Sequence, residues 1–355
     1  MSDRKLAKLV AIDSLEPIAK ADRLELARVG GWQSVVQKGE FQVGQEVVYI
    51  EVDAWIPTSV APFLTRPGHT PKIYKGIQGE RLKTIKLRGV LSQGLILPVD
   101  QVRSIVKEKP ELEGGFIDDI LGITKWEREQ GGGNVLGSSN GRNWPYFLQK
   151  TDQERIQNCF NDMTHVSNAV LAHGLWEVTE KLDGSSMTVY CKAIEGGFSV
   201  GVCSRNIDLE QAEGNRFWEV ALALDLPKKL EQYCRDEDLE LAVQGELIGP
   251  GIQGNKHGLD QYKFVVFDIY DIRNRSYLHA SLRRSITKDL GLQHTPVLGN
   301  HRLAEFKTVQ EVLAFAEGKM TYTDNEREGV VFKNLLLPNV SFKAISNKFL
   351  LKNDD

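Results

Sequence analysis

The first hundred residues contain short runs in which apolar and polar positions alternate or β-branched residues cluster. Such runs, with no long helical pattern between them, are typical of β-strands. Gly30 and Gly31 predict a tight turn between two of the runs. The pattern therefore predicts a small closed β-barrel. Its strands are expected over residues 8–12, 24–29, 32–36, 46–50, 83–87 and 94–98.

A different pattern begins near residue 148, where strand-like runs alternate with helical stretches, as in an α+β domain. Residues 151–154 (Thr-Asp-Gln-Glu) form a capping-box pattern that predicts a helix running through Arg155, Ile156 and Phe160. Strands are expected over residues 174–180, 186–193, 240–247, 262–270, 328–333 and 340–345, and helices near 212–235, 281–290 and 308–318.

Glycine and serine gather between the two patterns, at residues 131–133 and 137–141, and Pro145 follows. Such a cluster is typical of a linker. We therefore expect a first domain over residues 1–130, a linker over 131–147 and a second domain over 148–355.

Composition narrows the class of protein. The chain has 355 residues, of which 41% are hydrophobic and 26% charged, as in an ordinary globular protein. Its four cysteines form no Cys-x-x-Cys pair, which argues against a zinc knuckle and favours reduced thiols. No long apolar segment is present. We therefore expect a cytoplasmic protein without membrane contact.

Local charge is more informative than the net charge of −4. Residues 72–88 hold six Lys or Arg residues against the single acid Glu80. A stripe of this kind can meet phosphates. On charge alone, however, a solvated strand face is the preferred interpretation.

The clearest candidate chemistry lies at residues 180–186 (Glu-Lys-Leu-Asp-Gly-Ser-Ser). An expected strand ends at Lys181, Asp183 follows on the same face if the strand continues, and Gly184 permits a tight turn. Taken alone, this tetrapeptide also fits a solvated turn with a chance ion pair.

An ordered series of further motifs changes that judgement, because each places a charged or aromatic residue on or beside an expected strand. They lie at residues 204–206 (Ser-Arg-Asn), 245–247 (Gly-Glu-Leu), 267–269 (Phe-Asp-Ile), 328–331 (Glu-Gly-Val-Val) and 341–343 (Ser-Phe-Lys). Any one of these is weak, but the ordered set is hard to obtain by chance.

This series resembles the motif order of covalent nucleotidyltransferases, and within them the Deinococcus/Naegleria-type ATP-dependent RNA ligases. Residues 12–17 and 21–25 also resemble the opening of OB-folds that bind tRNA. The resemblance implies an N-terminal OB-fold barrel and a C-terminal nucleotidyltransferase domain with antiparallel sheets flanked by helices. It also implies a lysyl-adenylate on Lys181.

The nucleophilic role makes a demand on the charge of Lys181. A lysine amine attacks phosphorus only when neutral, whereas its ordinary pKa is about 10.4. Acidic neighbours alone would raise that pKa, while a bound cation and Lys343 would lower it. We therefore expect Mg²⁺ or Mn²⁺, held through water by Asp183, Glu246 and Glu328.

The resemblance further implies a cycle of three phosphoryl transfers. Lys181 takes AMP from ATP, AMP passes to an RNA 5′-phosphate, and an RNA 3′-hydroxyl then displaces AMP. Many relatives carry Lys-x-Lys in the last motif, but Ser341 stands at its first position here. The residues implied in nucleotide binding are Glu180 (through its backbone carbonyl), Lys181, Arg155, Arg205, Phe267 (stacking on adenine), Glu328, Lys343 and Lys348.

Two other classes of function remain open from the sequence. DNA ligases and mRNA-capping enzymes share the covalent lysine but usually place an OB domain after the nucleotidyltransferase domain, whereas only seven residues follow Lys348 here. A non-catalytic OB-fold RNA-binding protein would explain residues 1–100 but not the later motifs. We expect a monomer that acts on RNA with 3′-hydroxyl and 5′-phosphate ends, in a nicked duplex.

Overall fold

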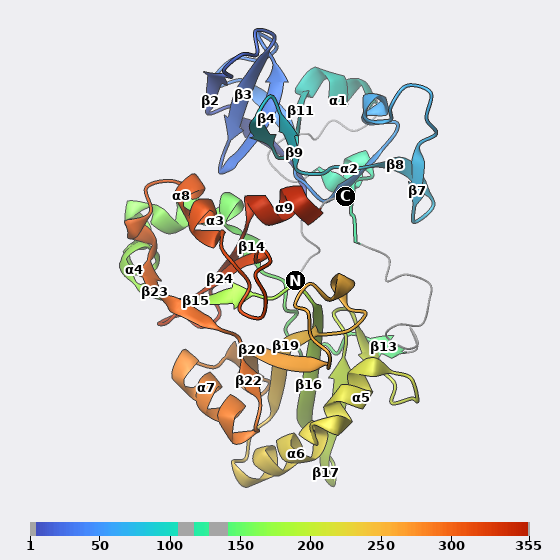
Figure 1. Ribbon diagram of the computed structural model, residues 1–355, viewed down its shortest axis with the longest axis vertical. Helices are drawn as coiled ribbons and strands as arrows, with labels where there is room; N and C mark the ends of the chain where they lie inside the picture. Colours follow the sequence, from blue (N-terminus) through green and yellow to red (C-terminus); the bar gives the residue numbers. More distant parts are fainter. Residues whose placement is uncertain (1–4, 106–116, 128–140, 354–355) are drawn as a thin grey trace. The chain divides into compact units, whose positions relative to one another are not determined.

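The computed structural model describes residues 5–105, 117–127 and 141–353 (Figure 1). The chain divides into two compact units, one of residues 1–130 with 350–355 and the other of residues 131–349. Residues 131–140 of the expected linker lie outside the described residues. Residues 141–143 form strand β13 (Gly141–Asn143), which pairs with β18 (Ile207–Leu209). No helix in the described ranges is both long enough and apolar enough to span a bilayer.

The N-terminal unit is built from short antiparallel strands, and most of the expected strands are confirmed. They form the sheets β1 (Ala7–Ala11), β5 (Glu46–Ile50), β11 (Leu95–Pro98); β2 (Ser14–Pro17), β3 (Leu24–Val29), β4 (Trp32–Gln37); β12 (Thr124–Lys125), β6 (Ala54–Pro57), β8 (Ile77–Arg81), β7 (Lys72–Tyr74); and β9 (Ile85–Leu87), β10 (Val90–Ser92). Two short helices, α1 (Val99–Ile105) and α2 (Asp118–Leu121), follow the strands.

The prediction of a closed barrel was wrong in one respect, because the described strands pair as separate sheets. Between β4 and β10, side chains replace most of the backbone ladder. The Ser92 hydroxyl accepts the Val35 N–H at 3.0 Å and lies 3.3 Å from the Ser34 hydroxyl. Within the basic stripe, Arg81 pairs with Asp53 at 2.7 Å, so this cation is already neutralised.

The second unit contains two sheets, and the expected α+β class is confirmed. One sheet has the order β13-β18-β17-β16-β19-β20-β21, with β22 also pairing β20, and the other has the order β14-β25-β24-β15-β23. All pairs are antiparallel except β14–β25 and β20–β22. The strands not yet given are β14 (Glu154–Arg155), β15 (Leu175–Lys181), β16 (Ser185–Ile194), β17 (Gly197–Cys203), β19 (Leu241–Ile248), β20 (Lys263–Asp271), β21 (Ser276–Tyr277), β22 (Gln293–His294), β23 (Val297–Arg302), β24 (Gly329–Asn334) and β25 (Ser341–Ile345).

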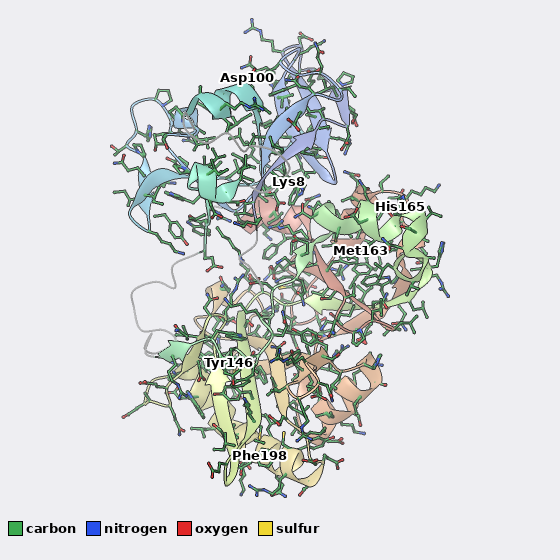
Figure 2. All side chains as sticks on the ribbon, turned by 180° about the vertical axis from the view of Figure 1, so that it is seen from behind. Lys8, Asp100, Tyr146, Met163, His165 and Phe198 are labelled. Carbon is green, nitrogen blue, oxygen red and sulfur yellow. The ribbon has the colours of Figure 1, made fainter. Side chains whose placement is uncertain are left out.

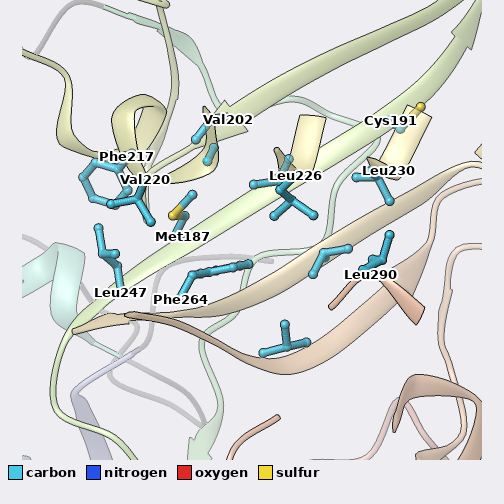
Figure 3. Packing of buried hydrophobic residues seen from close by; sticks show 14 of the residues in the cluster. Met187, Cys191, Val202, Phe217, Val220, Leu226, Leu230, Leu247, Phe264 and Leu290 are labelled. Carbon is cyan, nitrogen blue, oxygen red and sulfur yellow. The ribbon is translucent and has the colours of Figure 1, made fainter. Parts of the chain in front are cut away.

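Each of the two sheets packs against helices through its own apolar core. One core packs α5 and α6 against alternate side chains of the larger sheet, among them Met187, Val202 and Leu247 (Figure 3). The other joins α3 and α8 to the smaller sheet around Phe332 and Phe342, whose rings stack 4.8 Å apart. The helices are α3 (Ile156–Thr164), α4 (Ala169–His173), α5 (Arg216–Ala223), α6 (Leu226–Asp236), α7 (Ala280–Asp289), α8 (Val309–Ala316) and α9 (Asn347–Asn353).

Two local predictions were wrong. The helix expected over residues 212–235 is two helices, because Asp225 has a left-handed φ of 53° and a new helix begins at Leu226, with Pro227 in its first turn. The capping box does not form either. The Thr151 hydroxyl instead lies 2.8 Å from that of Ser186. Arg155 belongs to β14, which pairs with β25 in parallel, and α3 begins only at Ile156.

Candidate active site

The predicted nucleophile is the last residue of an interior strand of the smaller sheet. β15 lies between β23 and β24, and its last residue, Lys181, is opposite Gly329 of β24. The Lys181 ammonium donates a hydrogen bond to the Glu328 carboxylate at 2.7 Å, and the two side chains are 24% and 16% exposed. Strand pairing thus joins two motifs that are far apart in the sequence.

Gly329 is required for the close approach of the third strand in this group. Its φ is +156°, and a Cβ there would lie 2.1 Å from the Ala344 carbonyl oxygen of β25. This approach places Lys343 of β25 within electrostatic reach of Glu328. Burial raises the pKa of Glu328, while the ammonium groups of Lys181 and Lys343 oppose the rise.

A second sheet contributes Glu246, which stands on β19 opposite Ser186 of β16. Burial raises the pKa of Glu246 to about 8, and the nearby carboxylates of Glu328 and Asp183 add to the rise. Lys181 and Arg205 act in the opposite direction. The predicted acids and the predicted nucleophile therefore share one electrostatic environment.

That environment keeps Lys181 protonated. Burial alone lowers its pKa, but Glu328, Glu246 and Asp183 outweigh burial, and the pKa of Lys181 is raised above its ordinary value. The result agrees with the expectation that acidic neighbours without a cation leave the amine charged. A nucleophile at this position requires additional positive charge nearby.

Sequence reasoning missed one cation in this group, Lys256. Its ammonium pairs with Asp183 at 2.7 Å and lies 4.6 Å from the centroid of the Phe349 ring. The neighbouring His257 is 2% exposed, and burial lowers its pKa. The only sequence signal was the glycine-rich loop after Glu246, which gives no indication of which side chain returns to Asp183.

Two predicted arginines lie at the edges of the group. Arg155 is opposite Lys343 in the parallel pair of β14 and β25, and it is 5% exposed. Arg205 follows β17 and pairs with Asp152 at 2.6 Å. The positive charge of Arg205 also reaches Glu246.

Phe267 lies at an irregularity of its strand, and the side chain of Glu180 is held by hydrogen bonds. The β19–β20 register shifts so that Asp268 and Val266 have partners and Phe267 lies at a bulge. The Lys333 ammonium lies 5.5 Å from the centroid of the Phe267 ring. The Glu180 carboxylate accepts hydrogen bonds from the backbone and hydroxyl of Thr321.

The structure does not bring Lys348 to this group. Its side chain is 63% exposed and its ammonium pairs with Glu317 at 2.7 Å. Ser341, which stands where many relatives have lysine, lies opposite Lys333 at the start of β25. The last motif therefore contributes Lys343 alone.

Metal binding was expected through water. Among the described residues, no group of three or more His, Cys, Asp or Glu side chains lies close enough to hold a metal ion directly. The carboxylates of Asp183, Glu246 and Glu328 nevertheless form the acidic surroundings of Lys181. Burial raises the pKa of Glu246 and of Glu328, so added positive charge would be favourable there.

Comparison with known proteins decides the family. An RNA ligase family model matches residues 174–345, and an OB-fold domain model matches residues 6–99. A ligand-free variant of Naegleria gruberi RNA ligase is 38% identical, with a TM-score of 0.86 over 100% of both chains. This chain belongs to the RNA ligase family. The prediction made from the motif series is therefore confirmed, and so is the OB-fold followed by a nucleotidyltransferase domain.

Two further structures of the Naegleria gruberi ligase are similar to this RNA ligase. A variant with ATP and manganese is 39% identical, with a TM-score of 0.85 over 99% of this chain and 98% of that chain. The enzyme with pyrophosphate is 39% identical, with a TM-score of 0.86 over 99% of both chains. A search of curated proteins gave no match.

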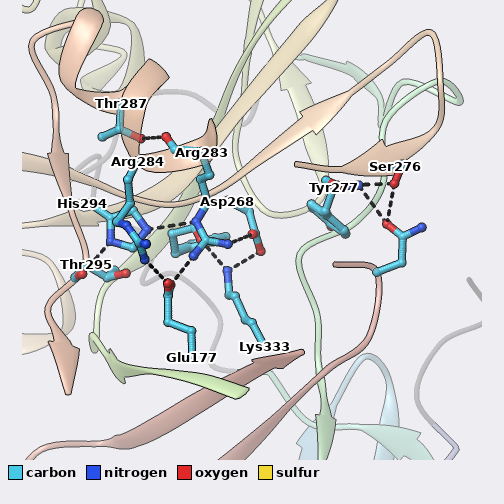
Figure 4. A network of polar contacts seen from close by, with 12 residues as sticks. Glu177, Asp268, Ser276, Tyr277, Arg283, Arg284, Thr287, His294, Thr295 and Lys333 are labelled. Carbon is cyan, nitrogen blue, oxygen red and sulfur yellow. Dashed lines mark hydrogen bonds and ion pairs between the residues drawn. The ribbon is translucent and has the colours of Figure 1, made fainter. Parts of the chain in front are cut away.

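A buried polar network joins the two sheets of the ligase (Figure 4). Glu177 of β15 accepts hydrogen bonds from both Arg283 and Arg284 of α7. Arg283 also lies 3.4 Å from Asp268 of β20, which pairs with Lys333 of β24. The network therefore connects the strand that ends at Lys181 to the strand that carries Phe267.

His294 provides a pH-dependent contribution to stability. Burial, followed by the charge of Arg283, lowers the pKa of His294 to about 3, and its Nε2 accepts a hydrogen bond from Arg283 at 3.0 Å. Folding therefore favours the neutral ring. This contribution is complete above the ordinary histidine pKa of about 6.5 and is lost progressively as pH falls toward 3.

We expect His294→Gln to reduce the loss of stability between pH 6.5 and pH 5, because glutamine cannot be protonated and its amide oxygen can still accept from Arg283. Urea unfolding at several pH values measures the effect. The exposed His165→Gln is the control and should follow the wild-type slope. Equal slopes for wild type and His294→Gln would contradict the assignment.

Proposed function

We propose that this ligase uses ATP to join RNA 3′-hydroxyl and 5′-phosphate ends, through a lysyl-adenylate on Lys181 and an RNA-adenylate. The observation that carries the proposal is the placement of Lys181 at a strand end, 2.7 Å from Glu328 and surrounded by Asp183 and Glu246. The similarity to a ligase solved with ATP and manganese supports the choice of nucleotide. We further propose nick sealing during RNA repair as the setting.

A divalent cation fits the acidic side of this site. Oxygen ligands suit Mg²⁺ and Mn²⁺, and Mg²⁺ commonly keeps several waters. We infer that Asp183, Glu246 and Glu328 hold the cation through such waters. When bound, it supplies the positive charge that lowers the pKa of Lys181 and offsets the charge of the phosphates.

In the first step, the neutral Lys181 amine attacks the α-phosphorus of ATP. The new bond is N–P, the bond to the β-phosphate oxygen breaks, and pyrophosphate leaves. Lys343 lies on β25, which pairs with β24, and it offsets the charge that develops on the phosphate. Arg155 lies opposite Lys343 on β14.

In the second step, an oxygen of the RNA 5′-phosphate attacks the same phosphorus and releases Lys181. In the third, the RNA 3′-hydroxyl attacks the activated 5′-phosphate and AMP leaves. In the free enzyme, Glu328 accepts a hydrogen bond from the Lys181 ammonium. The same hydrogen bond can form again once Lys181 has been released from AMP.

The base of the nucleotide is assigned to residues around the bulge. We propose that Phe267 stacks on adenine, that the Glu180 backbone carbonyl accepts from its amino group, and that Arg205 contacts ribose or phosphate. The Glu180 side-chain carboxylate is already engaged by the backbone N–H and hydroxyl of Thr321, so the backbone carbonyl is the group proposed to contact adenine.

We expect Phe267→Ala to raise the KM for ATP in protein adenylylation about tenfold, because base stacking on an aromatic ring contributes about 1–3 kcal/mol. The initial rate of label transfer from α-labelled ATP measures this KM. Phe267→Tyr keeps a ring and serves as the control. An unchanged KM in Phe267→Ala would remove Phe267 from the nucleotide site.

A sealing assay tests the function as a whole. Nicked duplexes with 3′-hydroxyl and 5′-phosphate ends are incubated with ATP or GTP, and the sugar on each side of the nick is varied between ribose and deoxyribose. Joining that needs ATP and a ribose 3′ end is the expected result. Joining only of deoxyribose ends would favour a DNA ligase, and transfer of GMP would favour a capping enzyme.

A further inference from the structure

Among the described residues, α5 and α6 pack on one face of the larger sheet, and the core on its other face contains no residue of either helix. Alternate residues of β16 point to opposite sides. Val189 and Cys191 belong to the core under α6, whereas Tyr190 packs with Phe147 on the other side. Lys192 has the same parity as Tyr190 and shares its face.

A cavity of about 370 Å³ lies on that face. Its floor is the Tyr190 ring, which lies directly over Gly201 of β17, since a Cβ at Gly201 would be 2.3 Å from the ring. Other lining residues are Arg142, Phe147, Lys192, Ser199 and Asp208. We call this cavity the Tyr190 pocket. Its volume lies within the range of small-molecule sites, about 300–1,000 Å³.

Phe147 and Lys192 line one side of the pocket, and Tyr146 lies next to both of them. Phe147 meets Tyr190 edge to face at 5.3 Å, and Tyr146 meets Phe147 in the same way at 5.6 Å. Tyr146, marked in Figure 2, is 85% exposed. The Lys192 ammonium lies 4.3 Å from the Phe147 centroid and 5.3 Å from that of Tyr146. An exposed ring beside a cation offers a flat apolar face and a positive charge to a ligand.

The charges of the pocket favour an anion. Asp208 is 5% exposed, and its carboxylate receives the Tyr190 hydroxyl at 3.2 Å and Arg142 at 3.0 Å. Arg142 remains 76% exposed. No carboxylate of the described residues lies within ion-pair distance of Lys192. The pocket therefore offers the Lys192 ammonium, together with Arg142, which stays largely exposed although it pairs with Asp208.

We propose that the Tyr190 pocket binds one nucleotide of the RNA substrate, with its base against Tyr146 and Phe147 and its phosphate on Lys192 and Arg142. This inference rests on the proposed function, which supplies RNA as the substrate. Stacking accepts any base, so the contact adds affinity without sequence preference. Lys192 is six residues beyond Ser186 on β16, which is about 20 Å at 3.3 Å per residue. Ser186 is opposite Glu246 of the candidate active site, so the pocket is a contact remote from that end of the strand.

Binding of a labelled single-stranded RNA, measured by fluorescence anisotropy with the full chain, tests the pocket. We expect Tyr146→Ala and Lys192→Ala each to raise Kd about five- to tenfold, since stacking and a phosphate contact each contribute on that scale. Tyr146→Phe and Lys192→Arg should bind nearly as well as wild type. Lys192→Ala should also reduce the slope of log K against log salt by about 0.7.

Lys228→Ala is the matched control, because it removes the same charge from α6, on the covered side of the sheet. Label transfer from ATP to the protein should be unchanged in every variant. Wild-type RNA affinity in Tyr146→Ala would overturn the inference. So would a loss of RNA affinity in Lys192→Ala that is no larger than the loss in Lys228→Ala. A variant that changed only the self-association of the protein, and not its RNA affinity, would overturn it as well. Failure of the wild type to accept label from ATP would instead sink the proposed function.

Discussion

Lys181→Ala is expected to abolish transfer of label from α-labelled ATP onto the protein. The variant removes the nucleophilic amine, which is the group that lies 2.7 Å from the Glu328 carboxylate. The remaining acids would hold a cation but have no group to receive AMP. Denaturing electrophoresis of the labelled protein measures the effect, and loss of signal to background, at least a thousandfold, is the expected size for removal of a covalent nucleophile.

Lys181→Arg should be as inactive as Lys181→Ala, because a guanidinium stays protonated and cannot attack phosphorus. This variant also keeps a cation beside Glu328, so it separates loss of the nucleophile from loss of the ion pair. Lys319→Ala is the matched control, since Lys319 pairs with Glu326 at the same 2.7 Å but is 59% exposed. Strong labelling of either Lys181 variant would identify another nucleophile.

The order of motifs could be predicted because each one is local. A strand end, an acid two residues later and a glycine turn are visible in a few consecutive residues, and the strand expected at 174–180 is present as Leu175–Lys181. The same holds for Glu246 on β19 and Lys343 on β25. Strand pairing then follows from the family, which explains why this group of residues assembles as expected.

Contacts between distant, non-repeating positions could not be predicted. Lys256 reaches Asp183 from a loop 73 residues away, and nothing in the intervening sequence specifies the pair. Thr151 shows the converse case, because its capping pattern was plausible but a tertiary bond to Ser186 replaced it. The only sequence signal for the break between the two helices at Asp225 was Pro227. A proline is compatible with the first turn of a helix, so this signal depends on where the second helix begins.

The buried ion network could not be predicted from the sequence either. Glu177 and Arg283 are 106 positions apart, and in a strand and a helix they look like ordinary surface charges. In the structure, Glu177 is 0% and Arg283 3% exposed. Such burial is tolerated only because each carboxylate meets more than one cation.

Arg283→Ala is expected to lower the stability of the ligase by about 3 kcal/mol. The change leaves Glu177 with Arg284 alone and Asp268 with Lys333 alone, and a buried charge that loses its partner typically costs about 3–5 kcal/mol. The retained cations place the loss at the lower end of that range. Scanning calorimetry should show a fall in Tm of roughly 6–12 °C for a domain of this size.

The matched control is Arg235→Ala, which breaks an exposed pair with Glu231 in α6. Because such pairs contribute little, its Tm should stay within about 2 °C of wild type. The positive charge of Arg283 also lowers the pKa of Lys333. Burial is the main cause of its fall to about 8, Asp268 opposes it, and Arg283 adds to it. Arg283→Ala should therefore leave Lys333 more firmly protonated and Asp268 still paired with it. If the Tm of Arg283→Ala equalled that of Arg235→Ala, the network would contribute no net stability.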